Sequence, residues 1–351
     1  DLLTAMGNDI IHRGPDSAGY LNEKGLAGVF RRLSILDTSI NADQPMTINK
    51  ISIFFNGEIY NYKKLKTELE LKGIHFKSTG DTEVVLRGYE IFGERIFNLL
   101  EGMFSIVIIN RLSGKVVVAR DPLGIKPLYI FRKGSFTGIA SEIRPILRLC
   151  KPDVDINALK ELMVFGWAAG KMSNYKNIEE VSPGSMIKID LKSGKLKEDK
   201  YFDLMKISKE NNFINEDVIE NQINKSILDH TISDVGYTLQ LSGGLDSSYI
   251  SAICSKEKKV KLKAFSINFN EEKFDEAKYQ EMISQKFNLD LYMNKFSGKD
   301  YVDELPKAIE SMEGPTPHGG CVAIKFLSKK ISKFCKVTLT GEGADELFGG
   351  Y

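Results

Sequence analysis

The sequence predicts an α+β sandwich in the first half of the chain and an α/β domain with a doubly wound parallel sheet in the second half. Strand-like runs follow one another in the first half, strand and helix patterns alternate in the second, and a polar stretch without periodicity separates them at residues 208–217. Successive strands with helices alongside are typical of stacked layers, whereas regular alternation is typical of a parallel sheet. The expected domains are residues 1–207 and 208–351.

The elements of the first half follow from short apolar runs and from helical periodicity. Strands are expected at residues 51–55, 104–110, 115–119 and 128–131. One helix follows Asn61 and carries Leu65 and Leu69 on one stripe, while a second follows Asp81, a good N-cap residue.

The second half alternates helices and strands. The expected order is helix 217–230, strand 236–241, helix 247–255, strand 262–269, helix 275–286 and strand 336–340. In a parallel sheet of this kind the ligand lies beyond the carboxyl ends of the strands. Ser242 and Gly341 both fall at such ends, so we expect the segments that they begin to face one site.

Composition narrows the class of protein. The chain has 351 residues, of which 42% are hydrophobic and 27% charged, enough for about two globular domains. A net charge of +1 gives no basic field for nucleic acid. No apolar run is long enough to span a membrane and no leader opens the chain, so a cytoplasmic location is expected. The 4 cysteines form no Cys-x-x-Cys pair, which indicates reduced thiols.

Residues 242–248, Ser-Gly-Gly-Leu-Asp-Ser-Ser, join a predicted strand to a predicted helix. Glycine lets the backbone pass close to a ligand, serine hydroxyls donate hydrogen bonds, and a helix N-terminus adds N–H groups and partial positive charge. The segment is therefore a candidate phosphate cradle. Asp246 would repel phosphate unless a cation stood between them, which indicates Mg²⁺ on a nucleotide's pyrophosphate. A polar turn capped by Ser or Asp is the simpler alternative.

The whole heptad resembles the pyrophosphate loop of the N-type ATP pyrophosphatases, and within that superfamily it is most similar to the glutamine-dependent asparagine synthetases. Neither a Gly-x-x-x-x-Gly-Lys-Ser/Thr loop nor a Gly-x-Gly-x-x-Gly helix start occurs in the sequence. The resemblance implies that ATP contacts Gln240, Leu241, Ser242, Gly243, Gly244, Asp246, Ser247, Ser248, Ile267, Thr340 and Gly341. For Ile267, the alternative interpretation is that it is a plain buried strand residue.

Five segments of the first half occur in the order seen in class II glutamine amidotransferases. They are residues 12–16 (HRGPD), 32–37 (RLSILD), 56–61 (NGEIYN), 80–83 (GDTE) and 120–129 (RDPLGIKPLY). The resemblance implies an N-terminal-nucleophile sandwich with αββα layers, in which a mature N-terminal cysteine attacks the amide of glutamine. The printed chain begins at Asp1, so we expect that cysteine upstream of it in a longer protein.

The resemblance also assigns the glutamine contacts. Arg32 suits the α-carboxylate, Glu58 and Asp81 the α-ammonium, and the Asn56 side chain with the Gly57 N–H the oxyanion. Leu33 and Ile35 complete the expected glutamine-binding set. Taken singly, these residues have simpler interpretations: a surface ion pair for Arg32, a helix cap for Asp81, and a type I′ hairpin turn for Asn56-Gly57.

A second motif, Thr-Gly-Glu-Gly-Ala-Asp-Glu-Leu-Phe-Gly-Gly-Tyr at residues 340–351, follows the last predicted strand. By the resemblance it faces the pyrophosphate loop, where Asp345 pairs with Asp246 as a Mg²⁺ ligand and Glu342 acts as the base for the attacking amine. A solvated acidic turn is the alternative. Between the motifs, residues 313–321 correspond to a segment near the acceptor pocket, where His318 either reads a carboxylate or is structural.

The combined resemblance implies one mechanism: glutamine is hydrolysed in the first domain, and ammonia travels inside the protein to displace AMP from an aspartyl-adenylate in the second, forming asparagine and releasing pyrophosphate. A dry route keeps ammonia unprotonated. Two alternatives stay open: an adenylating or lactam-forming ligase for another carboxylate, and a non-catalytic scaffold, which the intact acids at 246, 342 and 345 disfavour. A homodimer is left open. Family members continue beyond the position of Tyr351 with a helical region that supplies a catalytic lysine.

Overall fold

The chain is described by a computed structural model that covers residues 1–210, 215–257, 260–269, 275–315 and 318–350. It forms two compact units, Asp1–Asn212 and Phe213–Tyr351. The sequence predicts the linker at residues 208–217, but its predicted ends are wrong. Helix α6 (Leu204–Glu210) extends into this range, and helix α7 (Glu216–Asp229) begins within it. Its asparagines partly explain the error: Asn215 is the N-cap of α7 and accepts the N–H of Val218. Residues 211–214 of the linker lie outside the described residues.

Unit 1 is built on a six-stranded sheet in the order β11-β10-β6-β5-β4-β3, with antiparallel pairing throughout. Its strands are β3 (Met46–Ile48), β4 (Ile51–Ile59), β5 (Gly102–Asn110), β6 (Lys115–Arg120), β10 (Ser185–Asp190) and β11 (Leu196–Lys200). A three-stranded sheet in the order β8-β7-β9 and a hairpin form further layers. These strands are β1 (Ser17–Glu23), β2 (Leu26–Arg32), β7 (Tyr129–Lys133), β8 (Phe136–Ala140) and β9 (Ile178–Glu180).

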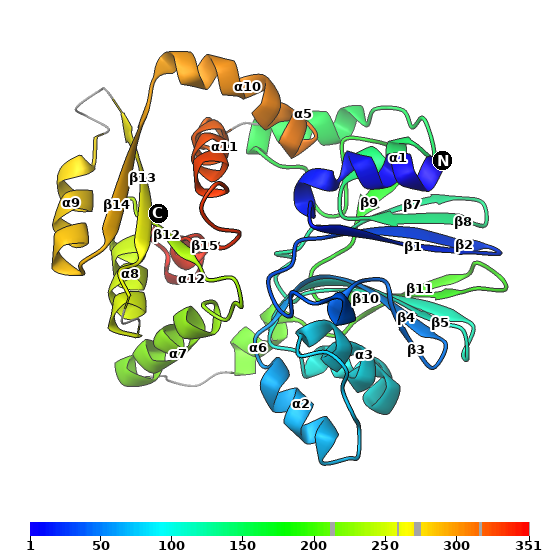
Figure 1. Cartoon of the computed structure of the whole chain (residues 1–351). Helices are drawn as coiled ribbons and strands as arrows, with labels where there is room; N and C mark the ends of the chain where they lie inside the picture. The colour runs from blue at the N-terminus through cyan, green and yellow to red at the C-terminus, as the bar shows by residue number, and fades with distance from the viewer. Residues whose placement is uncertain (211–214, 258–259, 270–274, 316–317, 351) are drawn as a thin grey trace. The chain divides into compact units, whose positions relative to one another are not determined.

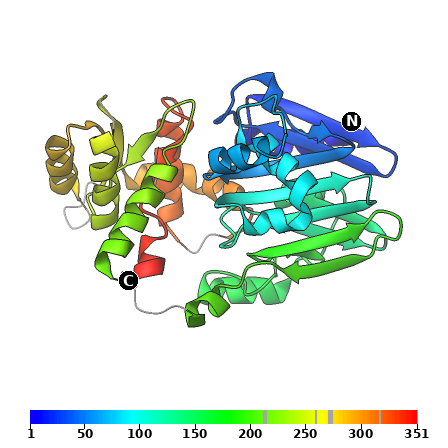
Figure 2. The same cartoon turned by 90° about the horizontal axis from the view of Figure 1, so that it is seen from below.

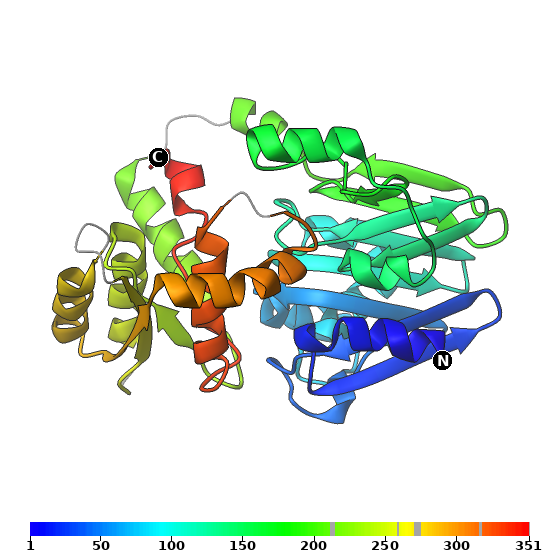
Figure 3. The ribbon, with the colours of Figure 1, turned by 90° about the horizontal axis from the view of Figure 1, so that it is seen from above.

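Helices cover both sides of the stacked sheets of unit 1. They are α1 (Leu2–Asp9), α2 (Tyr62–Glu70), α3 (Asp81–Phe92), α4 (Ile143–Leu147) and α5 (Ile156–Phe165), with 3₁₀ turns at Ile11–Arg13, Ile40–Ala42 and Gly93–Asn98. Figures 1 and 2 show α2 and α3 against the six-stranded sheet, and Figure 3 shows α1 along the β1–β2 hairpin. The predicted αββα sandwich is thus confirmed.

The apolar core of unit 1 lies between the sheets. Buried Leu21 of β1 and Ile130 of β7 join Val118 of β6 and Ile187 of β10 in one cluster. Removing such side chains from water is the main stabilising contribution to a fold of this kind. The strands predicted for this half correspond to β4, β5, β6 and β7, and each is present.

Unit 2 has a parallel sheet in the order β14-β13-β12-β15. Its strands are β12 (Thr238–Gln240), β13 (Lys263–Phe269), β14 (Asp290–Phe296) and β15 (Thr338–Leu339). Its remaining helices are α8 (Leu245–Glu257), α9 (Ala277–Lys286), α10 (Gly298–Met312), α11 (Gly320–Ile331) and α12 (Ala344–Phe348). Both faces are covered, as predicted for a doubly wound sheet: α7, α8 and α9 pack against Leu239 and Ala264, whereas α10 and α11 pack against Ile267 on the other face.

The sequence pattern did not reveal β14, α10 or α11. β14 is an edge strand in which only Phe296 is buried, and its polar Asp290, Asn294 and Lys295 interrupt the apolar run by which a strand is recognised. The helix α10 contains Pro306, which normally argues against a helix interior. No helix among the described residues is both long and apolar enough to cross a membrane.

Candidate functional site

The phosphate loop of unit 2, residues 242–248, is held by its own serine side chains. The Ser242 N–H donates to the Ser247 hydroxyl at 3.3 Å, the two hydroxyl groups lie 2.9 Å apart, and the Gly244 N–H donates to the Ser242 hydroxyl at 3.2 Å. The Ser248 hydroxyl donates to the Gly244 carbonyl at 2.6 Å. These bonds close the turn directly after β12 and lead into the first turn of α8, whose N–H groups a phosphate oxygen can use.

Gly243 is required by the shape of this turn. Its φ of 92° is in the left-handed region that favours glycine, and a Cβ atom there would lie only 2.9 Å from the Tyr279 Cβ. The loop therefore approaches α9 more closely than any residue with a side chain allows.

The second acidic segment meets this loop, as expected. β15 pairs with β12 through Thr238–Thr338 and Leu239–Leu339, which brings the ends of both strands to one edge. A Cβ atom at Gly341 would lie 3.0 Å from the Asp246 Cβ and 3.3 Å from the Ser247 N. The backbone that follows Thr340 is thus in contact with the first turn of α8. Glu342 follows Gly341, and Asp345 lies in the first turn of α12.

The acidic residues of this edge suit a magnesium ion that arrives with a nucleotide. Among the described residues no group of three or more His, Cys, Asp or Glu side chains is arranged to hold a metal ion by itself. Mg²⁺ typically takes one or two carboxylates and completes its shell with water and substrate phosphates. Asp246 and Asp345 are the candidates for such hard oxygen donors, and the absence of a side chain at Gly341 lets the backbone of the second segment lie close to Asp246.

The adenosine contacts that the resemblance implies lie at the ends of β12 and β13. Gln240 pairs with Phe265, and the Leu241 N–H donates to the Phe265 carbonyl at 2.9 Å. The buried Ser266 hydroxyl donates to the Leu241 carbonyl at 2.5 Å, so the two strands stay joined beyond their ladder. Ile267 is only partly buried, where it packs against side chains of α10 and α11, so the alternative of a plain buried strand residue is met only in part. In the proposed acceptor segment, residues 316–317 lie outside the described residues.

In unit 1, Asn56 and Gly57 occur within β4, opposite Ser105 and Phe104, so the hairpin-turn interpretation is wrong. A Cβ atom at Gly57 would lie 2.1 Å from the Met103 carbonyl oxygen, which only glycine avoids. The Asn56 Nδ2 is buried and has no hydrogen-bond partner among the described residues. A buried donor without an acceptor is costly, and a developing oxyanion would satisfy it.

Glu58 and Asp81 form the acidic part of the same region. Asp81 begins α3, but the predicted N-cap role is wrong, since Gly80 is the N-cap residue and the Asp81 Oδ2 instead accepts the Ile59 N–H at 3.0 Å. Burial, with a further contribution from Asp81, raises the pKa of Glu58 to about 7. Burial raises the pKa of Asp81 to about 6, against its hydrogen bonds with backbone N–H groups. These two acids suit an ammonium ion, which would restore their charged forms.

Arg32 is 6% exposed and organises the loop that follows β2. Its NH1 donates to the Ser39 carbonyl and to the Asp43 Oδ1, both at 2.8 Å, and its NH2 donates to the Asp37 carbonyl and, at 3.4 Å, to that of Leu36. The ion pair of the simpler interpretation is present, with the partly exposed Asp43, but Arg32 itself is buried rather than on the surface. Leu33 and Ile35 lie partly buried in the loop that these bonds hold.

Two groups near the site escaped the sequence analysis. Lys126, in the loop after β6, interacts electrostatically with Glu58, and burial lowers its pKa. The Asp121 Oδ2 accepts the N–H of both Lys126 and Phe104, at 3.0 and 3.2 Å, so this loop is fixed beside β5.

Gln44 is the second group that the sequence analysis missed. Its side-chain amide donates to the Phe55 carbonyl at 3.0 Å and accepts the Phe55 N–H at 2.6 Å. Position within the RDPLGIKPLY motif could have indicated Lys126; no sequence pattern indicated Gln44.

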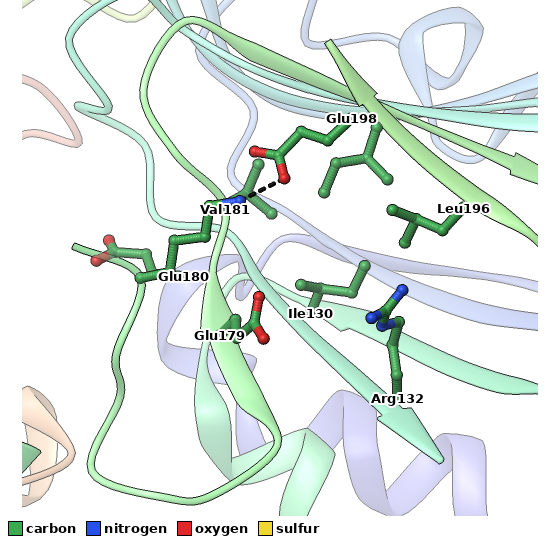
Figure 4. A pocket seen from close by; sticks show the side chains of 9 residues that line it. Ile130, Arg132, Glu179, Glu180, Val181, Leu196 and Glu198 are labelled. Atoms are coloured by element: carbon green, nitrogen blue, oxygen red, sulfur yellow. Dashed lines mark hydrogen bonds and ion pairs between the residues drawn. The ribbon is translucent and has the colours of Figure 1, made fainter. Parts of the chain in front are cut away.

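A small cavity elsewhere in unit 1 has a volume of about 70 Å³ and is drawn in Figure 4. An ion pair between Lys171 and Glu198 and the side chains of Arg132 and Glu179 line it, and it contains none of the predicted glutamine residues. Ligand pockets are typically several hundred cubic ångströms. The cavity is too small for an amino acid.

The fold and the site together define a glutamine amidotransferase sandwich joined in one chain to a nucleotide-loop α/β unit. A family model described as a glutamine amidotransferase domain matches residues 1–202, and one described as asparagine synthase matches residues 218–351. More specifically, the chain belongs to the glutamine-hydrolysing asparagine synthetase family.

Curated relatives support this membership. The chain is 36% identical to asparagine synthetase (glutamine-hydrolyzing) 1 of Bacillus subtilis, over 100% of this chain and 56% of that protein. It is 30% identical to putative asparagine synthetase (glutamine-hydrolyzing) 2 of Methanocaldococcus jannaschii, over 99% of this chain and 72% of that protein. The chain thus spans little more than half of the first relative. A solved glutamine PRPP amidotransferase from B. subtilis, 17% identical, superposes with a TM-score of 0.42 over 83% of this chain and 62% of that one.

Proposed function

We propose that the protein is a glutamine-dependent amide ligase that converts aspartate to asparagine with ATP. Unit 1 would hydrolyse glutamine, and unit 2 would activate the acceptor carboxylate as an adenylate. The observation that carries the proposal is the contact of Gly341 with Asp246, because it joins two acidic segments, some 95 residues apart in sequence, at the carboxyl edge of a parallel sheet.

The glutamine site would use the residues of β4 and the loops beside it. Arg32 would bind the α-carboxylate of glutamine, and ionised Glu58 and Asp81 would bind its α-ammonium group, within a pocket that Leu33 and Ile35 help to form. The Asn56 Nδ2 and the Gly57 N–H would donate to the oxygen that becomes negative when the amide is attacked. The Asn56 Nδ2 is buried and has no hydrogen-bond partner in the described part of the chain, which supports this role, since the donor is preorganised before any charge develops.

The ligase site would use both acidic segments. The N–H groups of the 242–248 loop and of the α8 N-terminus would bind phosphate oxygens, with Gln240, Leu241 and Ile267 on the nucleoside side. Asp246 and Asp345 would hold Mg²⁺, which neutralises phosphate charge and orients the leaving pyrophosphate. Glu342 would accept a proton from ammonia as its nitrogen attacks the acyl carbon. The C–N bond then forms as the bond to AMP breaks.

Aspartate is proposed as the acceptor because the relatives named above are asparagine synthetases. The test incubates the complete protein with ATP, Mg²⁺, glutamine and a panel of carboxylic acids, while pyrophosphate release and amide product are followed. Pyrophosphate and asparagine that appear only with aspartate would support the proposal. Pyrophosphate that appears only with another acid would instead identify a different adenylating ligase.

A further inference from the structure

The side chain of Gln280 connects the phosphate loop with Ile267 of β13, a residue expected on the nucleoside side of the site. Gln280 lies on α9 and is only 1% exposed. Its Nε2 donates to the Ser242 carbonyl at 3.3 Å and to the Ile267 carbonyl at 3.2 Å. A primary amide has two N–H donors, and these two bonds use both of them.

Both carbonyl groups lie beyond the last pair of the β12–β13 ladder, Gln240–Phe265, although Ile267 still pairs with Asn294 of β14. The last paired residue of β12 is Gln240, so Ser242 lies beyond the register with β13. For both carbonyl groups the hydrogen-bond donor is the Gln280 side chain rather than a neighbouring strand. The relative position of the Ser242 and Ile267 backbones therefore depends on Gln280.

A second buried amide fixes the orientation of the first. The Asn268 Nδ2 donates to the Gln280 Oε1 at 2.8 Å, and Asn268 is 6% exposed. The same Nδ2 lies 3.3 Å from the Asp275 Oδ1, which also accepts the Ala277 N–H in the first turn of α9. Because the Gln280 oxygen is occupied, its nitrogen must face the two carbonyl groups.

The backbone of α9 sets the loop position as well. A Cβ atom at Gly243 would lie 2.9 Å from the Tyr279 Cβ and 3.3 Å from the Gln280 N. One turn of α9 thus packs closely against Gly243 of the loop and also donates a hydrogen bond to the loop through the Gln280 amide. Neither Gln280 nor Asn268 belongs to the motifs that the sequence analysis identified.

We propose that Gln280 is a positioning residue that fixes the spacing between the phosphate loop and the Ile267 segment of β13, which would lie on the nucleoside side, so that one ATP molecule can use both at once. This inference rests on the proposed function. The affinity for a ligand that occupies only the phosphate loop or only the nucleoside side should not depend on the spacing between them. The affinity for a nucleoside triphosphate should depend on it, because one molecule can make both sets of contacts only at the right separation.

The experiment compares two substitutions at Gln280 with one control in the complete protein. Gln280→Glu keeps the side-chain shape without donors, and Gln280→Met keeps its length without polar atoms. Gln285→Glu makes the same chemical change at an exposed position of α9. Isothermal titration calorimetry measures the Kd of Mg-ATP, of adenosine and of magnesium pyrophosphate, with thermal unfolding of each variant recorded alongside.

We expect both Gln280 variants to bind Mg-ATP about tenfold more weakly, from the loss of two neutral hydrogen bonds. Adenosine and pyrophosphate should change less than about twofold, and Gln285→Glu should match the wild type. Equal weakening of all three ligands, or no weakening of Mg-ATP, would overturn the role of Gln280. If the wild-type protein binds none of the three, the proposed function itself fails, which is a distinct result.

Discussion

Glu58 and Asp81 form a pair of interacting carboxyl groups held by one backbone bond, since the N–H of the residue after Glu58 donates to the Asp81 Oδ2 at 3.0 Å. Burial and the neighbouring Asp81 raise the pKa of Glu58 to about 7, and burial raises that of Asp81 to about 6. Arg32 and Lys126 act on the pair in the opposite direction. The region therefore changes charge close to neutral pH, with consequences for both binding and stability.

Glutamine affinity should fall as the pH is lowered from 8 to 5.5. An α-ammonium group needs ionised carboxylates, and protonation begins near pH 7 at Glu58 and near pH 6 at Asp81. We expect a loss of about tenfold or more, since one pKa unit corresponds to about 1.4 kcal/mol. Calorimetric titration of glutamine across this range measures it. A flat profile would contradict the ammonium-binding role.

Glu58→Gln should stabilise the protein at pH 8 while it removes glutamine binding. The pKa of Glu58 in the folded protein lies above the ordinary glutamate value of 4.5, so the folded state favours the protonated form. Stability is therefore lost as the pH rises from about 4.5 to about 7, and it is fully present below about pH 4.5. We expect Tm to rise by roughly 2–4 °C at pH 8, as about 1 kcal/mol would produce, and little at pH 5. Glu68→Gln, at an exposed position of α2, is the control. An equal rise at both pH values would contradict the mechanism.

Much of this arrangement could be predicted from the sequence. Apolar runs predicted β4 to β7, β12 and β13, and the position of Ser242 and Gly341 after strands predicted that their segments meet. The remainder depends on long-range contacts. The local sequence cannot show whether the Asp81 side chain caps α3 or accepts the Ile59 N–H, because an aspartate suits either role. Likewise, the amides of Gln44 and Gln280 became significant only when the fold placed backbone carbonyl groups against them.

Asn56→Ala should lower kcat for glutamine hydrolysis by about 10²–10³, with KM changed far less. The Asn56 Nδ2 has no partner among the described residues of the free protein, so its bond forms mainly as charge develops on the substrate oxygen. Steady-state glutaminase kinetics of the complete protein measure this. Asn22→Ala, at an exposed position of β1, should retain wild-type rates. A rise in KM with unchanged kcat would show that Asn56 only binds substrate.

Asp246→Asn and Arg32→Ala should separate the two halves of the reaction. The first should abolish pyrophosphate release and leave glutaminase activity measurable, because Asp246 would act only at the Mg²⁺ of unit 2. The second should impair glutamine use yet retain asparagine formation when ammonia is supplied. Parallel assays of glutamate and pyrophosphate test both. Equal loss of the two activities in either variant would contradict this division.

Gly341→Ala should weaken Mg-ATP binding by about tenfold or more. A Cβ atom there would lie 3.0 Å from the Asp246 Cβ and 3.3 Å from the Ser247 N, so the first turn of α8 must shift. Gly298→Ala, where an added Cβ meets nothing within 4 Å, serves as the control. Calorimetry on both variants gives the comparison. Unchanged affinity in Gly341→Ala would mean that the second segment can move without disturbing the nucleotide.

The strand β15 has only two residues, and its partner β12 precedes it by about a hundred positions. During synthesis, the ribosome releases the phosphate loop long before Thr338 and Leu339 exist to lie beside it. Closing so distant a pair is slow relative to forming local helices. A nascent chain should therefore pass through a stage with an open sheet edge, at which chaperones or aggregation compete with completion of the nucleotide site.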